Sequence, residues 1–211
     1  AGLPFSFSYG GKRSSEFLDT WERTETSEPV GDGAERTTLT LTDPATGLQV
    51  TVVSTVYTDT PGVDWTLQFT NTGAADTPPI DHLRTLDAGF SLGFAGAVTL
   101  HRLNGSVCQT DDWLPFDQSI APGQRAEMST SNGRSSSISP FYTLDWGQAG
   151  IVTAIGWSGQ WTASAELRDG VLTSQAGLQA TRIALHPGES FRGPRILQML
   201  WAGGDVQEAH N

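Results

Sequence analysis

The segment 104–115 contains the side chains best suited to bind a sugar. It is irregular and polar, and it includes two neighbouring carboxylates, Asp111 and Asp112, followed by Trp113. A flat indole ring can stack on the apolar face of a pyranose, while carboxylates accept strong hydrogen bonds from its hydroxyl groups. The candidate sugar-binding residues of this segment and its entrance are Trp113, Asp111, Asp112, His101 and Asn104.

The same segment admits a structural interpretation. Trp113 can cap the fold, and Asp111 and Asp112 can satisfy backbone groups of their own loop. A glycosidase needs two carboxylates about 5–9 Å apart across the scissile bond. Adjacent strand residues point to opposite faces, and adjacent loop residues rarely converge at that spacing. We therefore predict no catalytic pair here and no catalytic residue in this chain.

The histidines and the cysteine predict neither a metal centre nor a nucleophile. His82, His101, His186 and His210 are dispersed, without the short spacing of zinc ligands. Cys108 is the sole cysteine, so an intrachain disulfide and a cysteine-based zinc site are both excluded. We expect Cys108 to be a small buried residue. No metal or other cofactor is expected.

Charge and hydropathy narrow the range of partners. The chain has 12 basic and 23 acidic residues, with a net charge of -11. Nucleic-acid binding normally needs a basic stripe, which is lacking, and an acidic surface is repelled by anionic membranes. No stretch approaches the roughly 20 apolar residues of a membrane span. We expect neither nucleic-acid nor membrane partners.

Alternation of apolar and polar residues predicts β-strands throughout the chain. Strands at 39–41 and 48–52 flank turn residues at 43–47, which predicts a hairpin. Segment 25–35 is polar and is expected to be an exposed hairpin loop. Further strands are predicted at 65–70, 98–100, 141–146, 151–157, 161–167, 178–185 and 196–201. About a dozen strands at this spacing indicate an all-β sandwich or barrel.

The tryptophans on these strands are expected to pack in the core. Trp65, Trp146 and Trp201 stand in alternating or apolar segments. Trp157 and Trp161 bracket a tight turn, where core or rim packing is favoured over sugar stacking.

From the end of the sequence we expect the chain to be a piece of a longer protein. Near the end, Asp205 and Glu208 have the spacing of a helix N-cap and its capping-box partner. We expect a domain over 1–204 and the start of a linker helix over 205–211. No signal-peptide pattern is present, and a first residue of Ala1 is consistent with a processed or trimmed N-terminus.

Several short segments, in this order and spacing, make the whole chain resemble a known family. They are PFSFSYGGK at 4–12, Trp21, TDPATGL at 42–48, 57–65, FTNTG at 69–73, 83–87, LNGS at 103–106, GRSS at 133–136, PFYTLDW at 140–146, GWSGQW at 156–161 and LHPGE at 185–189. The chain resembles the N-terminal domain of bacterial family-36 glycoside hydrolases, the α-galactosidase (melibiase) group.

This resemblance implies a large antiparallel β-sandwich of the supersandwich, galactose-mutarotase-like type. In the family this domain precedes a catalytic (β/α)₈ barrel that carries both catalytic aspartates, and no residue of this chain matches them. The implied partners are an α-galactoside-type sugar, the protein's own barrel and, as in relatives, further copies in a homo-oligomer. A cytoplasmic bacterial location is expected, with secretion left open. The alternative functions are a stand-alone carbohydrate-binding module and a structural or oligomerisation domain.

Overall fold

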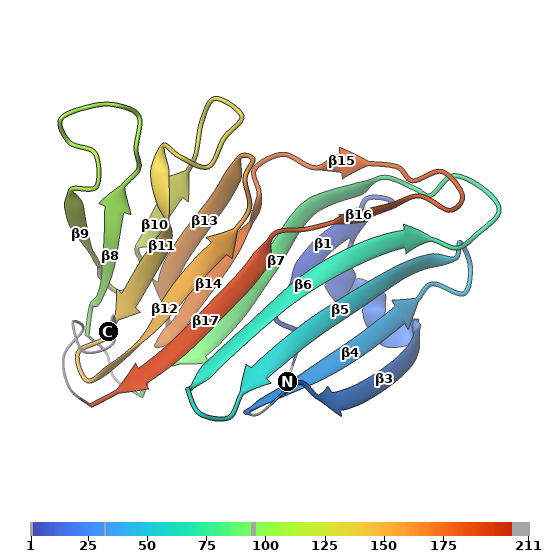
Figure 1. The fold of residues 1–211 in the computed structure, drawn as a ribbon, viewed down its shortest axis with the longest axis horizontal. Coiled ribbons are helices and arrows are strands. Elements are labelled where there is room, and N and C mark those ends of the chain that lie inside the picture. The colour runs from blue at the N-terminus through green and yellow to red at the C-terminus, as the bar shows by residue number, and fades with distance from the viewer. Residues whose placement is uncertain (1, 32, 94–95, 204–211) are drawn as a thin grey trace.

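The computed structural model describes residues 2–31, 33–93 and 96–203, which form two antiparallel β-sheets (Figure 1). The seven-stranded sheet has the order β10 (Arg125–Ser129), β13 (Trp161–Arg168), β14 (Val171–Leu178), β7 (Ile80–Ser91), β1 (Ser6–Tyr9) and β2 (Lys12–Arg13), with β15 (Arg182–Ile183) also paired to β7. Two short 3₁₀ turns, η1 (Ser14–Glu16) and η2 (Leu18–Thr20), follow β2.

The ten-stranded sheet lies across the first sheet (Figure 1). Its order is β3 (Glu22–Pro29), β4 (Ala34–Thr42), β5 (Leu48–Tyr57), β6 (Gly62–Asn71), β17 (Arg195–Ala202), β12 (Ala149–Gly156), β11 (Ile138–Asp145), β8 (Val98–Asn104) and β9 (Pro115–Ile120), with β16 (Ser190–Arg192) paired to β6. The predicted all-β sandwich is confirmed. In the described part of the chain, no helix is long and apolar enough to cross a membrane.

Two of the predicted segments differ from the structure. Segment 25–35, expected as a loop, includes the second half of β3 and the first two residues of β4, and β3 pairs along its whole length with β4. Every residue of β3 is exposed, because this strand forms the sheet's edge and needs no apolar face. The strand expected at 178–185 is reduced to the end of β14 and the two-residue β15. The linker helix predicted at 205–211 lies outside the described residues.

The core lies between the facing surfaces of the two sheets. Alternate residues of β6, including Trp65, Leu67 and Phe69, are buried there, as period-two strand geometry requires. Trp161 is fully buried, while Trp146 packs against the core from a half-buried position. Trp65 and Trp146 thus pack in or against the core as predicted, whereas Trp201 is half-buried and is not part of the core cluster.

Strand β7 contains two bulges that break its alternation. Against β1, two residues of β7, His82 and Leu83, oppose one, and His82 has a positive φ of 51°. Against β14, Ala176 pairs with Leu86 and Gly177 pairs with Arg84, so Thr85 is the extra residue. A bulge leaves a backbone group unpaired in the ladder and redirects the side chains around it.

A tryptophan from the opposite sheet donates a hydrogen bond to the Thr85 carbonyl at the bulge. The Trp65 indole N–H donates to the Thr85 carbonyl at 2.7 Å, and this hydrogen bond is buried. Gly177 is required at the same place, because a Cβ there would lie 2.1 Å from the Leu83 carbonyl oxygen. The bond therefore joins β6 of one sheet to β7 of the other.

We expect Trp65→Phe to lower the free energy of unfolding by about 1–3 kcal/mol, because the buried Thr85 carbonyl loses its partner. Urea denaturation of the variant and the parent measures this difference. Val56→Ala is the matched control, since Val56 is 51% exposed and its loss should change stability by less than about 0.5 kcal/mol. Equal stability of Trp65→Phe and the parent would contradict the proposed tie between the sheets.

Candidate functional site

The loop between β8 and β9, residues 105–114, is organised around the carboxylate of Asp112. Its oxygens accept the backbone N–H groups of Val107, Cys108 and Gln109 at 2.9, 3.0 and 3.3 Å. The Ser106 hydroxyl donates to the same carboxylate at 3.1 Å. These hydrogen bonds, led by that from Val107, lower the pKa of Asp112. Asp112 thus satisfies backbone groups of its own loop, which is the structural role that the sequence admits as an alternative to sugar binding.

A second loop supports this one from the side. The Ser106 N–H donates to the Ser136 carbonyl at 2.8 Å, and a Cβ at Gly105 would lie 1.8 Å from the same oxygen. Glycine is therefore needed for the two backbones to approach. Figure 1 shows the β8–β9 loop beside the loop that joins β10 to β11.

The backbone of Trp113 is hydrogen-bonded within the loop, and its indole ring is exposed to solvent. Its φ is +63°, its N–H donates to the Gly105 carbonyl at 3.3 Å, and the residue is 56% exposed. A left-handed conformation is unusual for a bulky residue. Trp113 therefore does not cap the core.

The other predicted residues lie along β8 and the loop. The Asn104 side-chain amide donates to the Asp111 carbonyl and to its Oδ2, both at 3.1 Å. His101 lies further down β8, with its Nδ1 2.8 Å from Asp117 and its Nε2 3.5 Å from Asp145. Asn104, Asp111, Asp112 and Trp113 thus belong to one hydrogen-bonded loop, whereas the contacts of His101 are with the neighbouring strands.

Cys108 is exposed, so its expected burial is wrong. It has a φ of +66°, and its backbone N–H is turned toward Asp112. The loop's carboxylate-centred arrangement places this small side chain at the surface. The described residues contain no group of three or more His, Cys, Asp or Glu side chains that could hold a metal ion.

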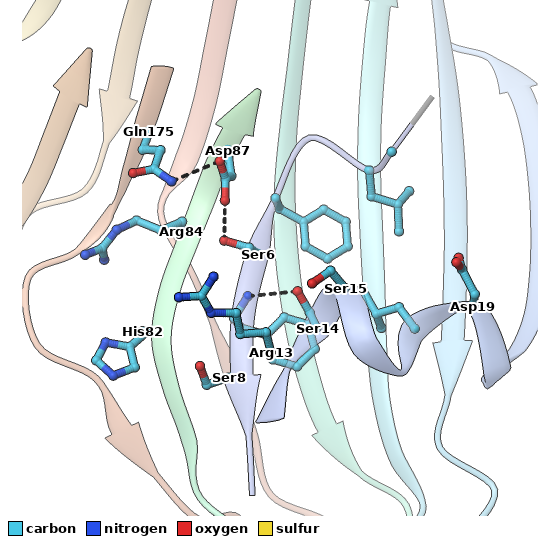
Figure 2. Close-up of a pocket in the computed structure, with 15 residues that line it drawn as sticks. Ser6, Ser8, Arg13, Ser14, Ser15, Asp19, His82, Arg84, Asp87 and Gln175 are labelled. Atoms are coloured by element: carbon cyan, nitrogen blue, oxygen red, sulfur yellow. Dashed lines mark hydrogen bonds between the residues drawn. The ribbon is translucent and has the colours of Figure 1, made fainter. Parts of the chain in front are cut away.

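Sequence reasoning missed a hollow of about 730 Å³ that is lined by residues of β1, β7, β14 and the 3₁₀ turns. Figure 2 shows Ser6, Asp87 and Gln175 close together, with the Asp87 carboxylate accepting from Ser6 Oγ at 2.6 Å and from Gln175 Nε2 at 3.0 Å. Arg84 and His82 also line this hollow. Its lining comes from residues 2–8, 13–19 and 82–87 and from Gln175, so no single local motif marks it.

Comparisons with known proteins yielded matches among solved structures. No family model and no curated protein matches the sequence. The α-galactosidase AgaA of family GH36 from Geobacillus stearothermophilus matches with a TM-score of 0.71 and 17% identity, over 97% of this chain and 30% of its own. The Lactobacillus brevis α-galactosidase matches with a TM-score of 0.73 and 14% identity, over 97% and 30%.

A third solved structure has a different activity in its name. The α-N-acetylgalactosaminidase NagBb from Bifidobacterium bifidum matches with a TM-score of 0.60 and 10% identity, over 99% of this chain and 32% of its own. The chain thus spans about 30% of the α-galactosidases it matches. It has the fold of their N-terminal domain, which confirms the resemblance at the level of fold.

We expect Asp112→Asn to loosen the β8–β9 loop, because charge-assisted hydrogen bonds to the backbone are lost. Amide hydrogen exchange at Val107 and Cys108 should accelerate by about tenfold. Since the folded-state pKa of Asp112 is lowered, its stabilisation is present above the unfolded value of about 3.9 and is lost as the pH falls through the folded value.

Asp111→Asn is the matched control for this experiment. Asp111 uses its carboxylate only toward the Asn104 amide in the described part of the chain, so the exchange at Val107 and Cys108 should stay at the parent's rate. Equal acceleration in both variants would show that Asp112 does not organise the loop.

Proposed function

We propose that this chain is the N-terminal, non-catalytic domain of an α-galactosidase-like glycoside hydrolase, and that its β8–β9 loop lines the sugar site of a separate (β/α)₈ catalytic domain. The likeness of fold to family-36 α-galactosidases and the chain's span of about 30% of their length support the first part. Variants of AgaA have been solved in complex with stachyose and raffinose. The proposed ligand is accordingly an α-galactoside.

The observation that carries the second part is the exposed ring of Trp113, whose backbone is hydrogen-bonded within the loop. An indole that is 56% exposed gains little from burial in the core of its own domain. Its left-handed backbone is an outlier, and such strain persists where the surrounding structure imposes it, commonly at ligand sites. Because the backbone that carries the ring is already ordered, less conformational entropy is lost when a sugar stacks on it.

The loop also offers an acceptor for a sugar hydroxyl. Asp111 uses Oδ2 for the Asn104 amide, while Oδ1 has no partner among the described residues. A charged acceptor beside an aromatic ring is the combination that sugar recognition uses. Asp112 has a different role, because its oxygens already accept the loop's own donors.

Exposed apolar residues around the loop fit a contact with the catalytic domain. Leu103 and Leu114 are 37% and 53% exposed, and the neighbouring Phe116 and Phe141 are 45% and 57% exposed. The Arg102 guanidinium lies 4.3 Å from the Phe116 ring centre, where a cation is attracted to the ring face. We infer that the barrel covers this end of the ten-stranded sheet.

We expect Trp113→Ala in the complete enzyme to lower kcat/KM for raffinose by about tenfold, equivalent to about 1.4 kcal/mol of transition-state binding. Trp113→Phe, which keeps a ring, should retain most of the activity, and Val56→Ala should match the parent. Hydrolysis rates over a range of raffinose concentrations give these values. An unchanged kcat/KM in Trp113→Ala would refute the sugar-site role.

The intact mass of the protein from its native source separates the domain proposal from a stand-alone binding module. A mass well above 22.5 kDa is expected for an enzyme that contains this chain as one domain. A mass near 22.5 kDa, together with calorimetric binding of raffinose by the chain, would overturn the domain proposal in favour of the module.

A further inference from the structure

The hollow over β1, β7 and β14 gathers two arginines and a histidine in an acidic protein. Arg13, His82 and Arg84 all line it, whereas the chain's net charge is -11. No ion pair joins any of these three to a carboxylate in the described part of the chain. Figure 2 shows the three side chains on one side of the hollow, with Asp19 on the other.

The two bulges of β7 create this arrangement. In a regular strand every second residue would face the core. Here Leu83 is buried, whereas His82 before it is exposed and Arg84 after it is half-buried. The bulge at Thr85 then places Asp87 on the same outer side as Arg84. The bulges thus bring three polar side chains of one strand to the hollow.

Arg84 is a partly buried cation whose charge lacks a direct counter-ion. Its Nη1 donates to the backbone carbonyls of Leu83 and Leu178 at 3.2 and 2.9 Å. Burial lowers its pKa, repulsion from Arg125 lowers it further, and attraction to Asp87 does not offset them. Its Nε and Nη2 have no hydrogen-bond partner among the described residues. They remain as donors for an external acceptor.

Asp87 does not serve as that acceptor. One of its oxygens accepts from Ser6 and the other from Gln175, at 2.6 and 3.0 Å. Both carboxylate oxygens of Asp87 thus accept from neutral donors, and neither forms an ion pair with Arg84. The Ser8 hydroxyl and the guanidinium of the exposed Arg13 complete the polar lining on this side.

We propose that this hollow binds a small hydroxylated molecule that carries an oxyanion, either a carboxylate or a phosphate. Arg13 and Arg84 would hold the anionic group, since guanidinium donors match the geometry of both oxyanions. The side chains of Ser6, Ser8 and Gln175 would hold hydroxyl groups. A sugar acid and a sugar phosphate share this chemistry. The inference is independent of the proposed glycosidase domain, because it uses none of the β8–β9 loop.

Calorimetric titration at low ionic strength tests the site, with D-glucuronate, glucose 6-phosphate, inorganic phosphate and neutral glucose as separate ligands. We expect at least one sugar anion to bind about tenfold more tightly than glucose and than inorganic phosphate. Binding of glucuronate alone identifies a carboxylate ligand, and binding of glucose 6-phosphate alone identifies a phosphate. Glucose derivatives also avoid the α-galactoside site proposed above.

Arg13→Gln should lower the affinity for the sugar anion by about tenfold. Arg84→Lys keeps the charge but not the forked arrangement of N–H donors, so it should also lower that affinity. Arg36→Gln is the control, because Arg36 is a partly exposed arginine on β4 of the other sheet. Trp113→Ala should bind the anion as the parent does. Thermal unfolding verifies that each variant is folded.

Three results would overturn the proposal. The first is that no sugar anion binds at concentrations up to about 10 mM. The second is that Arg36→Gln weakens binding as much as Arg13→Gln, which would mean unspecific attraction. The third is that inorganic phosphate binds as tightly as the sugar anions, which would remove the role of the hydroxyl groups.

Discussion

The buried hydrogen bond from Trp65 to the Thr85 carbonyl sets the relation between the two sheets. A carbonyl freed by a bulge inside a core would carry a desolvation cost, and the opposite sheet supplies the donor that removes it. A second polar contact between the sheets, between the hydroxyl groups of Tyr142 and Ser174 at 3.3 Å, is also buried. Apolar packing supplies the driving force, but these directional contacts fix how one sheet sits on the other.

Two surface features depend on this frame in different ways. The hollow beside β1 exists because β7 departs from regular alternation. The bulge that places Asp87 on the same side as Arg84 is the one whose carbonyl accepts from Trp65. The β8–β9 loop lies beyond the paired strands and obtains its order from Asp112. In both places an otherwise unpaired backbone group finds one side-chain partner, and the neighbouring side chains are held in position as a result.

The sequence was sufficient to predict the class of fold and the irregular segment that contains Trp113. Period-two alternation marked the hairpin of β4 and β5, and turn residues marked where strands end. It was insufficient for the bulges, because His82, Leu83 and Thr85 become exceptions only against their partner strands. Likewise, the contacts of Asp112 depend on the loop's three-dimensional path, and no local pattern distinguishes them from those of Asp111.

The exposed strand β3 has a consequence for how the protein behaves in concentrated solution. The free edge of a β-sheet can template pairing with another chain and so begin aggregation. Along β3, Glu22, Glu25 and Glu28 outnumber the single cation Arg23, which leaves net negative charge at that edge, and Pro29 removes a backbone donor at its end. Two copies that approach through this edge meet like charge, so the domain can carry a ten-stranded open sheet and still resist fibrous self-assembly.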